Sequence, residues 1–139
     1  MPRFALSELD GLDRLPNVRF PIYKLETNGT CEYDQWRETI KAEGTYAAEL
    51  KTLDTLILMH AQMQRLSPSK YKELSGGGDI KEFEFRSRNL RIYGFKLPGG
   101  PGQQGKVIFI GGHNDKTQQK HDIARMRRTK KEYYDSQSK

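Results

Sequence analysis

Apolar and polar positions alternate strongly in two neighbouring stretches of the chain, residues 80–86 and 90–97. In the first stretch Phe83 and Phe85 share one face and charged residues occupy the other, and a similar alternation begins at Leu90. A period of two is typical of half-buried strands. The three residues between the stretches are enough only for a tight hairpin. The pattern therefore predicts an antiparallel hairpin that carries its charged residues on one face.

Two more strands are predicted, one at residues 106–111 and one earlier in the chain at 18–26. The segment 98–105 is rich in glycine and proline, which do not continue a ladder, and predicts an exposed connection. Residues 1–16 show no clear period, so we expect a loosely ordered arm. We expect residues 17–139 to form a single domain.

Apolar residues at helical spacing predict three helices. The first begins near Asp34, a good N-cap, and ends at Gly44. The second follows Thr45 and carries the wide apolar stripe of a helix that lies on a sheet. The third, residues 121–134, has few apolar positions, so we expect it to pack by one narrow edge.

The order strand, helix, helix, three strands, helix predicts an α+β fold. We expect an antiparallel or mixed sheet of about four strands, with the N-terminal helix pair packed on one face and a C-terminal helix. The other face of the sheet would then be open, and the charged residues of the hairpin would stand on it.

The chain carries a formal net charge of +6, and its excess of cations is concentrated near the end. Residues 116–139 contain eight Lys or Arg against three Asp or Glu. Such a basic segment beside a charged sheet face favours a polyanionic partner, most commonly nucleic acid. The alternative is an ordinary solvated helix face.

Several classes of protein do not fit this sequence. No apolar run approaches the ~20 residues of a membrane helix, and the opening residues form no apolar signal region, so we expect a cytoplasmic protein without a membrane partner. The single cysteine, Cys31, excludes an internal disulfide and argues against a zinc site built on cysteines.

Candidate chemistry lies on the charged face of the hairpin, where Arg86 and Arg91 flank the turn. Guanidinium groups match the geometry of phosphate oxygens, Tyr93 offers a ring and a hydroxyl, and His113 titrates near neutrality. Together they fit RNA cleavage, in which a base activates the 2′-hydroxyl and the arginines stabilise charge on the phosphorus. This chemistry needs neither a metal nor another cofactor.

The same residues also have a purely structural interpretation. Glu82 and Glu84 can form cross-strand ion pairs with the arginines, worth from a few tenths to about 1 kcal/mol each. Tyr93 can be a half-buried sheet aromatic, and His113 can simply end a strand. The glycine clusters do not form a phosphate loop, because neither leads into a helix with a Lys-Ser/Thr pair. Both interpretations remain open on these residues.

Four short motifs occur in order along the chain: Leu74-Ser-Gly-Gly, Glu84-Phe-Arg86, Leu90-Arg91-Ile92 and the segment 112–116. With a helix before them and a basic helix after them, they resemble the RelE/ParE superfamily of toxins from bacterial toxin–antitoxin pairs. Within it, they are most similar to the HigB-like, phage-associated branch. The resemblance covers residues 20–134.

The resemblance implies an mRNA interferase: a ribosome-dependent endoribonuclease that cuts translated mRNA and is silenced by a cognate antitoxin. Arg91 matches the arginine that contacts the scissile phosphate, Arg86 matches the first-strand arginine, and His113 falls where the family has a further basic or catalytic group. Glu84 stands where some members have a lysine, so Glu84 or His113 would act as the base, with Tyr93 beside them.

Further RNA contacts are expected from the basic residues around the last helix, namely Lys116, Lys120, Arg125, Arg127 and Arg128. The alternative function is a binding module without cleavage. It would be either a ParE-like inhibitor of DNA gyrase or a phage-derived protein that keeps the fold.

Overall fold

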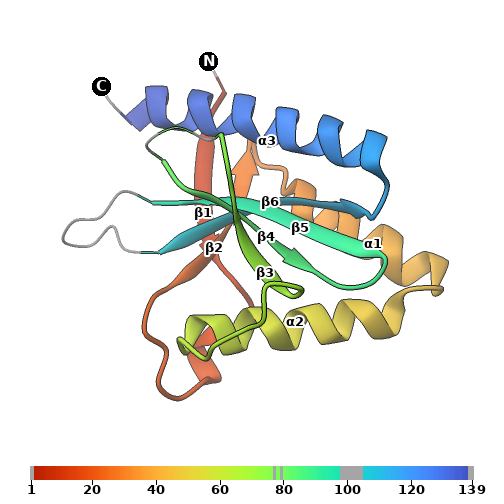
Figure 1. Ribbon diagram of the computed structural model, residues 1–139. Helices are drawn as coiled ribbons and strands as arrows, with labels where there is room; N and C mark the ends of the chain where they lie inside the picture. The colour runs from red at the N-terminus through yellow and green to blue at the C-terminus, as the bar shows by residue number, and fades with distance from the viewer. Residues whose placement is uncertain (1, 77, 79, 98–104, 138–139) are drawn as a thin grey trace.

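A mixed six-stranded sheet with helices on both faces forms the framework of the chain (Figure 1). The computed structural model describes residues 2–76, 78, 80–97 and 105–137. Its elements, in chain order, are β1 (Phe4–Glu8), the 3-10 turn η1 (Leu12–Arg14), β2 (Ile22–Thr27), α1 (Glu32–Glu43), α2 (Ala47–Ala61), β3 (Tyr71–Leu74), β4 (Glu82–Arg86), β5 (Leu90–Lys96), β6 (Lys106–His113) and α3 (Lys116–Gln137).

The strands lie in the order β1-β2-β6-β5-β4-β3. All neighbours are antiparallel except β2 and β6, which are parallel. The β4–β5 hairpin turns through residues 87–89, as the alternation predicted. It continues into β6, so the three strands form a meander.

The expected number of about four strands is wrong, because the sheet has two further strands at its edges. One is β1, within the segment 1–16 that we expected to be a loosely ordered arm, and the other is β3. Both are short, and each pairs with a single neighbour through a continuous register. The alternation of apolar and polar residues within β1 and β3 is too weak to predict either strand. Each is defined instead by its backbone hydrogen bonds to β2 or β4. The expected exposed connection at 98–105 lies, apart from Gly105, outside the described residues.

One core forms between the sheet and the pair α1 and α2. Phe83 and Phe85 of β4 and Leu90 of β5 are fully buried there, as the alternation predicted. They pack with Leu53 and Ile57 from the apolar stripe of α2. The N-terminal helix pair therefore covers one face of the sheet.

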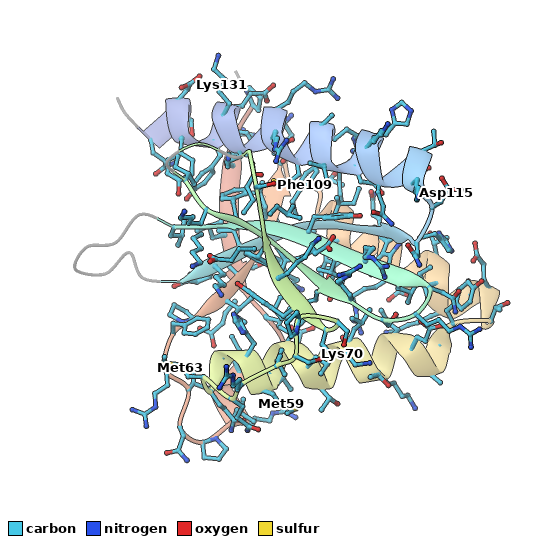
Figure 2. All side chains as sticks on the ribbon, in the orientation of Figure 1. Met59, Met63, Lys70, Phe109, Asp115 and Lys131 are labelled. Atoms are coloured by element: carbon cyan, nitrogen blue, oxygen red, sulfur yellow. The ribbon has the colours of Figure 1, made fainter. Side chains whose placement is uncertain are left out.

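The other face is not open, because α3 lies across it (Figure 1). Phe109 lies between the sheet and α3, while Lys131 of α3 points away from the sheet (Figure 2). Met126 and Tyr133 of α3 join this second core. The expectation of an exposed charged face failed because α3 supplements its few apolar contacts with buried ion pairs. In one of them, Lys130 Nζ lies 2.5 Å from the Glu82 carboxylate.

Within the described residues, no helix combines the length and the apolar character needed to cross a membrane.

Candidate functional site

The arginine cluster, which we define as Glu84, Arg86, Arg91 and Tyr93, stands on the face of β4 and β5 that α3 covers. Arg86 is the register partner of Arg91, and Glu84 is the partner of Tyr93. Because direct cross-strand partners project from one face, the hairpin places the two arginines next to each other on that face. The predicted pairing of the two arginines is therefore present.

Cations outnumber carboxylates in this cluster. The carboxylate of Glu84 lies 3.3 Å from Arg86 Nε and 4.0 Å from Nζ of Lys72 on β3. Arg91 Nη1 instead donates to the backbone carbonyls of Ser87 and Leu90, at 2.5 and 3.0 Å. Burial, together with the neighbouring charge of Arg86, lowers the pKa of Arg91. The cluster therefore has an excess of positive charge.

Three buried polar atoms near this cluster have no hydrogen-bond partner among the described residues: Arg91 Nε, the Tyr93 hydroxyl and Asp122 Oδ2. Asp122 comes from α3 and lies against Gly112 of β6, and its other oxygen accepts a bond of 3.0 Å from Gln118. Burial raises the pKa of Asp122. Burial, and then the charges of Glu84 and Asp122, also raise the pKa of Tyr93. Unsatisfied polar atoms are rare in protein interiors, so their concentration marks this region as a candidate site.

The cluster itself is largely closed to solvent. Tyr93 is 0% exposed, Glu84 4% and Arg91 6%, while the side chain of Arg86 is 29% exposed. Arg86 is thus the member that a ligand reaches first.

His113 does not join the arginines. Gly111 faces Trp36 of α1, whereas Gly112 faces Asp122 of α3, so strand alternation returns His113 to the α1 face. There its ring packs edge-on against Tyr46, with the ring centroids 5.6 Å apart. The expectation that His113 stands beside the arginines is therefore wrong in this structure.

The basic residues predicted to contact RNA fall into two groups. Lys116, Lys120 and Arg128 are exposed. Arg125 pairs with Glu32 of α1, and Arg127 donates to Glu82 at 2.8 Å and to the Ser75 carbonyl at 2.6 Å. Arg125 and Arg127 therefore bind α3 to its neighbouring elements and are not free for RNA.

Sequence reasoning missed the residue that holds the hairpin turn, Glu49 of α2. Its carboxylate accepts hydrogen bonds from the Ser87 hydroxyl at 2.6 Å, and from the backbone and side-chain amides of Asn89 at 2.8 and 2.7 Å. Burial opposes the charge of Glu49, but these bonds hold its pKa below the usual value. No periodic signal identifies Glu49, because its partners are 38 and 40 residues away. Asp122 and Lys72 were missed for the same reason.

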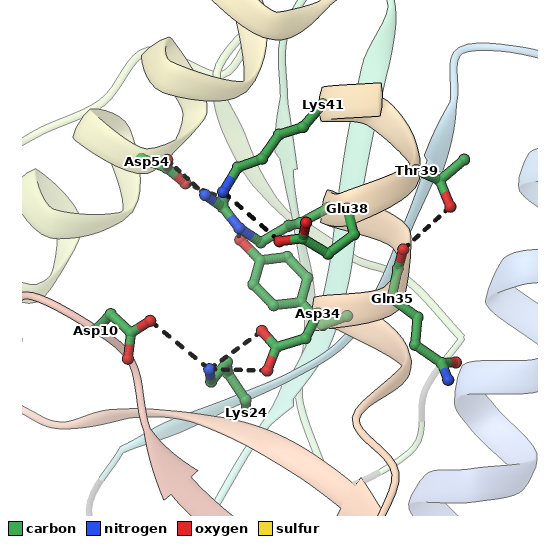
Figure 3. Close-up of polar contacts among 10 residues, drawn as sticks. Asp10, Lys24, Asp34, Gln35, Glu38, Thr39, Lys41 and Asp54 are labelled. Atoms are coloured by element: carbon green, nitrogen blue, oxygen red, sulfur yellow. Dashed lines mark hydrogen bonds and ion pairs between the residues drawn. The ribbon is translucent and has the colours of Figure 1, made fainter. Parts of the chain in front are cut away.

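A second polar cluster joins α1 to its neighbours (Figure 3). Lys24 of β2 donates to both oxygens of Asp34, at 3.1 and 3.0 Å, and Arg37 pairs with Asp54 of α2. These residues line a small pocket of about 130 Å³. Since each cation already has a carboxylate partner, we assign this cluster a structural role. Among the described residues, no three His, Cys, Asp or Glu side chains gather as they would around a metal ion.

Comparison of the chain with protein-family models, with curated proteins and with solved structures finds no match.

Proposed function

We propose that this chain is the toxin of a type II toxin–antitoxin pair and cleaves mRNA on the ribosome in the cytoplasm. The observation that carries the proposal is the register pairing of Arg86 with Arg91, which places two arginines directly opposite each other on neighbouring strands. An excess of positive charge at one point of a sheet face suits a phosphodiester. The RelE/ParE resemblance implies a helix, three consecutive strands and a basic helix. The chain has α2, the meander β4–β6 and α3 in this order, with the short strand β3 added after α2, and this order supports the proposal.

In the proposed reaction, Arg86 and Arg91 bind the scissile phosphate and stabilise the charge that develops on it. Glu84 takes the proton of the 2′-hydroxyl as the 2′-oxygen attacks phosphorus. The bond to the 5′-oxygen then breaks, and this oxygen takes a proton from Tyr93. His113, on the opposite face, has no part in this scheme. Exposed Lys116, Lys120 and Arg128 supply further contacts to the RNA backbone.

The test is expression of the chain in a bacterial host, with and without a neighbouring antitoxin gene, followed by mapping of mRNA 5′ ends. We expect growth arrest and cuts in frame with translated codons, both suppressed by the antitoxin. Arg86→Ala should abolish the cuts, while Arg65→Ala, an exposed change in the loop after α2, should leave them unchanged. Thermal melts of both variants check that the fold is retained. Growth arrest with intact mRNA would contradict the proposal.

A second candidate function is a binding module without cleavage, either a gyrase inhibitor or a phage-derived protein. The observation that favours it is the burial of Glu84, Arg91 and Tyr93 beneath α3. Blocked DNA supercoiling with intact mRNA would identify the gyrase inhibitor.

A further inference from the structure

A groove of about 680 Å³ runs between β3 and α3. Its apolar lining comes from Leu74 on β3 and from Ile123 and Ala124 on α3. Leu74 and Ile123 also pack at the margin of the core beneath α3. The groove thus has an apolar floor that is continuous with that core.

One wall of the groove is the free edge of the sheet, since β3 is the last strand and pairs only with β4 in the described structure. The Arg86 amide donates to the Lys70 carbonyl at 2.8 Å. Bonded pairs in an antiparallel ladder alternate, so the backbone groups of Glu73 point away from β4. An edge strand with outward N–H and C=O groups accepts an additional strand.

The rim of the groove is positively charged. The side chain of Lys72 is 49% exposed, and Lys120 stands exposed on the opposite wall. The nearby carboxylate of Glu73 is paired with Lys96 at 2.6 Å. A ligand in the groove would therefore contact the apolar floor and the ammonium groups of Lys72 and Lys120 at the rim.

We propose that this groove binds an extended acidic segment of a partner protein, which adds to β3 as a seventh strand. Lys72 and Leu74 lie on the same face of β3, so only every second side chain of the segment would enter the groove. Of these side chains, those opposite Lys72 and Lys120 would be acidic and those opposite Leu74 and Ile123 would be apolar. A nucleic-acid strand suits the groove less well, because the described residues that line it include no aromatic ring on which a base can stack. The inference does not depend on the proposed nuclease activity.

The experiment uses the full chain and a fluorescein-labelled ten-residue peptide in which every second residue is serine and the remaining positions alternate between glutamate and valine. We expect saturable binding by fluorescence anisotropy and slower hydrogen exchange at the Glu73 amide in the complex. The double change Lys72→Gln/Lys120→Gln should weaken binding about tenfold, and Ala124→Tyr, which fills the floor of the groove, should abolish it. The matched control is Lys51→Gln/Lys131→Gln, which alters exposed lysines elsewhere.

Three outcomes would overturn the proposal. The first is the absence of peptide binding by the unaltered chain. The second is binding without protection of the Glu73 amide, or with the same affinity in the groove variants. The third is that the groove variants weaken binding of a single-stranded RNA oligonucleotide but not of the peptide.

Discussion

Glu82 is a fully buried carboxylate that two cations of α3 share. Lys130 Nζ lies 2.5 Å from one oxygen and Arg127 Nε lies 2.8 Å from the other. Glu82→Gln keeps the shape of the side chain but removes the negative charge that pairs with both cations. We therefore expect the free energy of unfolding to fall by about 3 kcal/mol. Urea denaturation measures it, with Glu132→Gln on the exposed side of α3 as the control. Equal stabilities of the two variants would contradict the prediction.

The Tyr93 hydroxyl is buried and has no partner among the described residues. Tyr93→Phe removes a polar group whose burial costs free energy, so we expect unchanged stability or a gain of up to about 1 kcal/mol. In the control Tyr33→Phe, a hydroxyl that accepts a bond from Arg37 is lost, and stability should fall slightly. If Tyr93 donates the proton in the proposed reaction, RNA cleavage falls in Tyr93→Phe although stability does not. A clear loss of stability would show that the hydroxyl is bonded.

At the scale of elements, the β4–β5 hairpin is held to α2 by the carboxylate of Glu49. Glu49→Ala removes three hydrogen bonds to a charged acceptor, so we expect a loss of about 1–3 kcal/mol at pH 7. The folded pKa of Glu49 lies below its unfolded value, so this contribution is present above the unfolded pKa. It disappears as the pH falls through the folded pKa.

The measurement for Glu49 is urea denaturation of the variant and the unaltered chain from pH 7 down to pH 3. The two stabilities should converge as the pH falls. Glu38→Ala, which removes an exposed carboxylate of α1, should change stability by less than about 0.5 kcal/mol. A constant difference at every pH would show that Glu49 acts through packing rather than charge.

The elements that could be predicted from the sequence are those whose own side chains alternate. Phe83 and Phe85 identify β4 and its buried face without any help from the rest of the chain. The end of β6 departs from strict alternation, because its pairing with β5 shifts by one residue: Tyr93 pairs with Ile110 and Gly94 with Ile108. Phe109 and Ile110 consequently both pack in the core beneath α3. One step of alternation was therefore lost, and His113 was placed on the wrong face.

Helix α3 was recognised as a helix, but its position over the sheet was not. Its packing surface includes Lys130, which is buried, and Asp122, which is also buried. In the sequence, charged residues at these positions indicate a solvated helix face. Only their partners on the sheet show that they are buried. Long cationic side chains cover apolar surface with their stems, so a basic helix can bury a face that a count of apolar residues does not reveal.

For the molecule as a whole, the two faces of the sheet bury charge differently. Beneath α3, the buried Lys130 is paired with the carboxylate of Glu82. On the α2 side, Lys106 of β6 is buried and donates to the Tyr71 hydroxyl at 2.7 Å and to His60. Its ammonium group also lies 4.5 Å from the ring centre of Tyr71 and 5.2 Å from that of Phe20. An aromatic ring stabilises a cation less than a carboxylate partner would. The surroundings of Lys106 therefore disfavour the protonated form of its amine.

Burial, and then the charge of Lys96, lower the pKa of Lys106 to about 7, and Glu73 only partly opposes this. Burial and the charge of Lys106 likewise lower the pKa of His60 to about 3. Between pH 7 and the ordinary lysine pKa of 10.5, the unfolded chain therefore binds more protons at Lys106 than the folded chain does. The contribution of Lys106 to folding stability therefore rises with pH in that window. We expect this contribution to grow by roughly 4 kcal/mol across the full window.

Urea denaturation between pH 7 and pH 9.5 tests this linkage, because tyrosines stay largely protonated in both states over that range. The unaltered chain should become steadily more stable as the pH rises. Lys106→Met fits the same aromatic surroundings without a proton to lose, so the rise in stability should be absent. Burial raises the pKa of Cys31, which lowers stability at the top of this range in the variant and the unaltered chain alike. Lys131→Met, at an exposed position of α3, should keep the full slope. An equal slope in Lys106→Met would mean that another group carries the pH dependence and that Lys106 stays charged inside the folded protein.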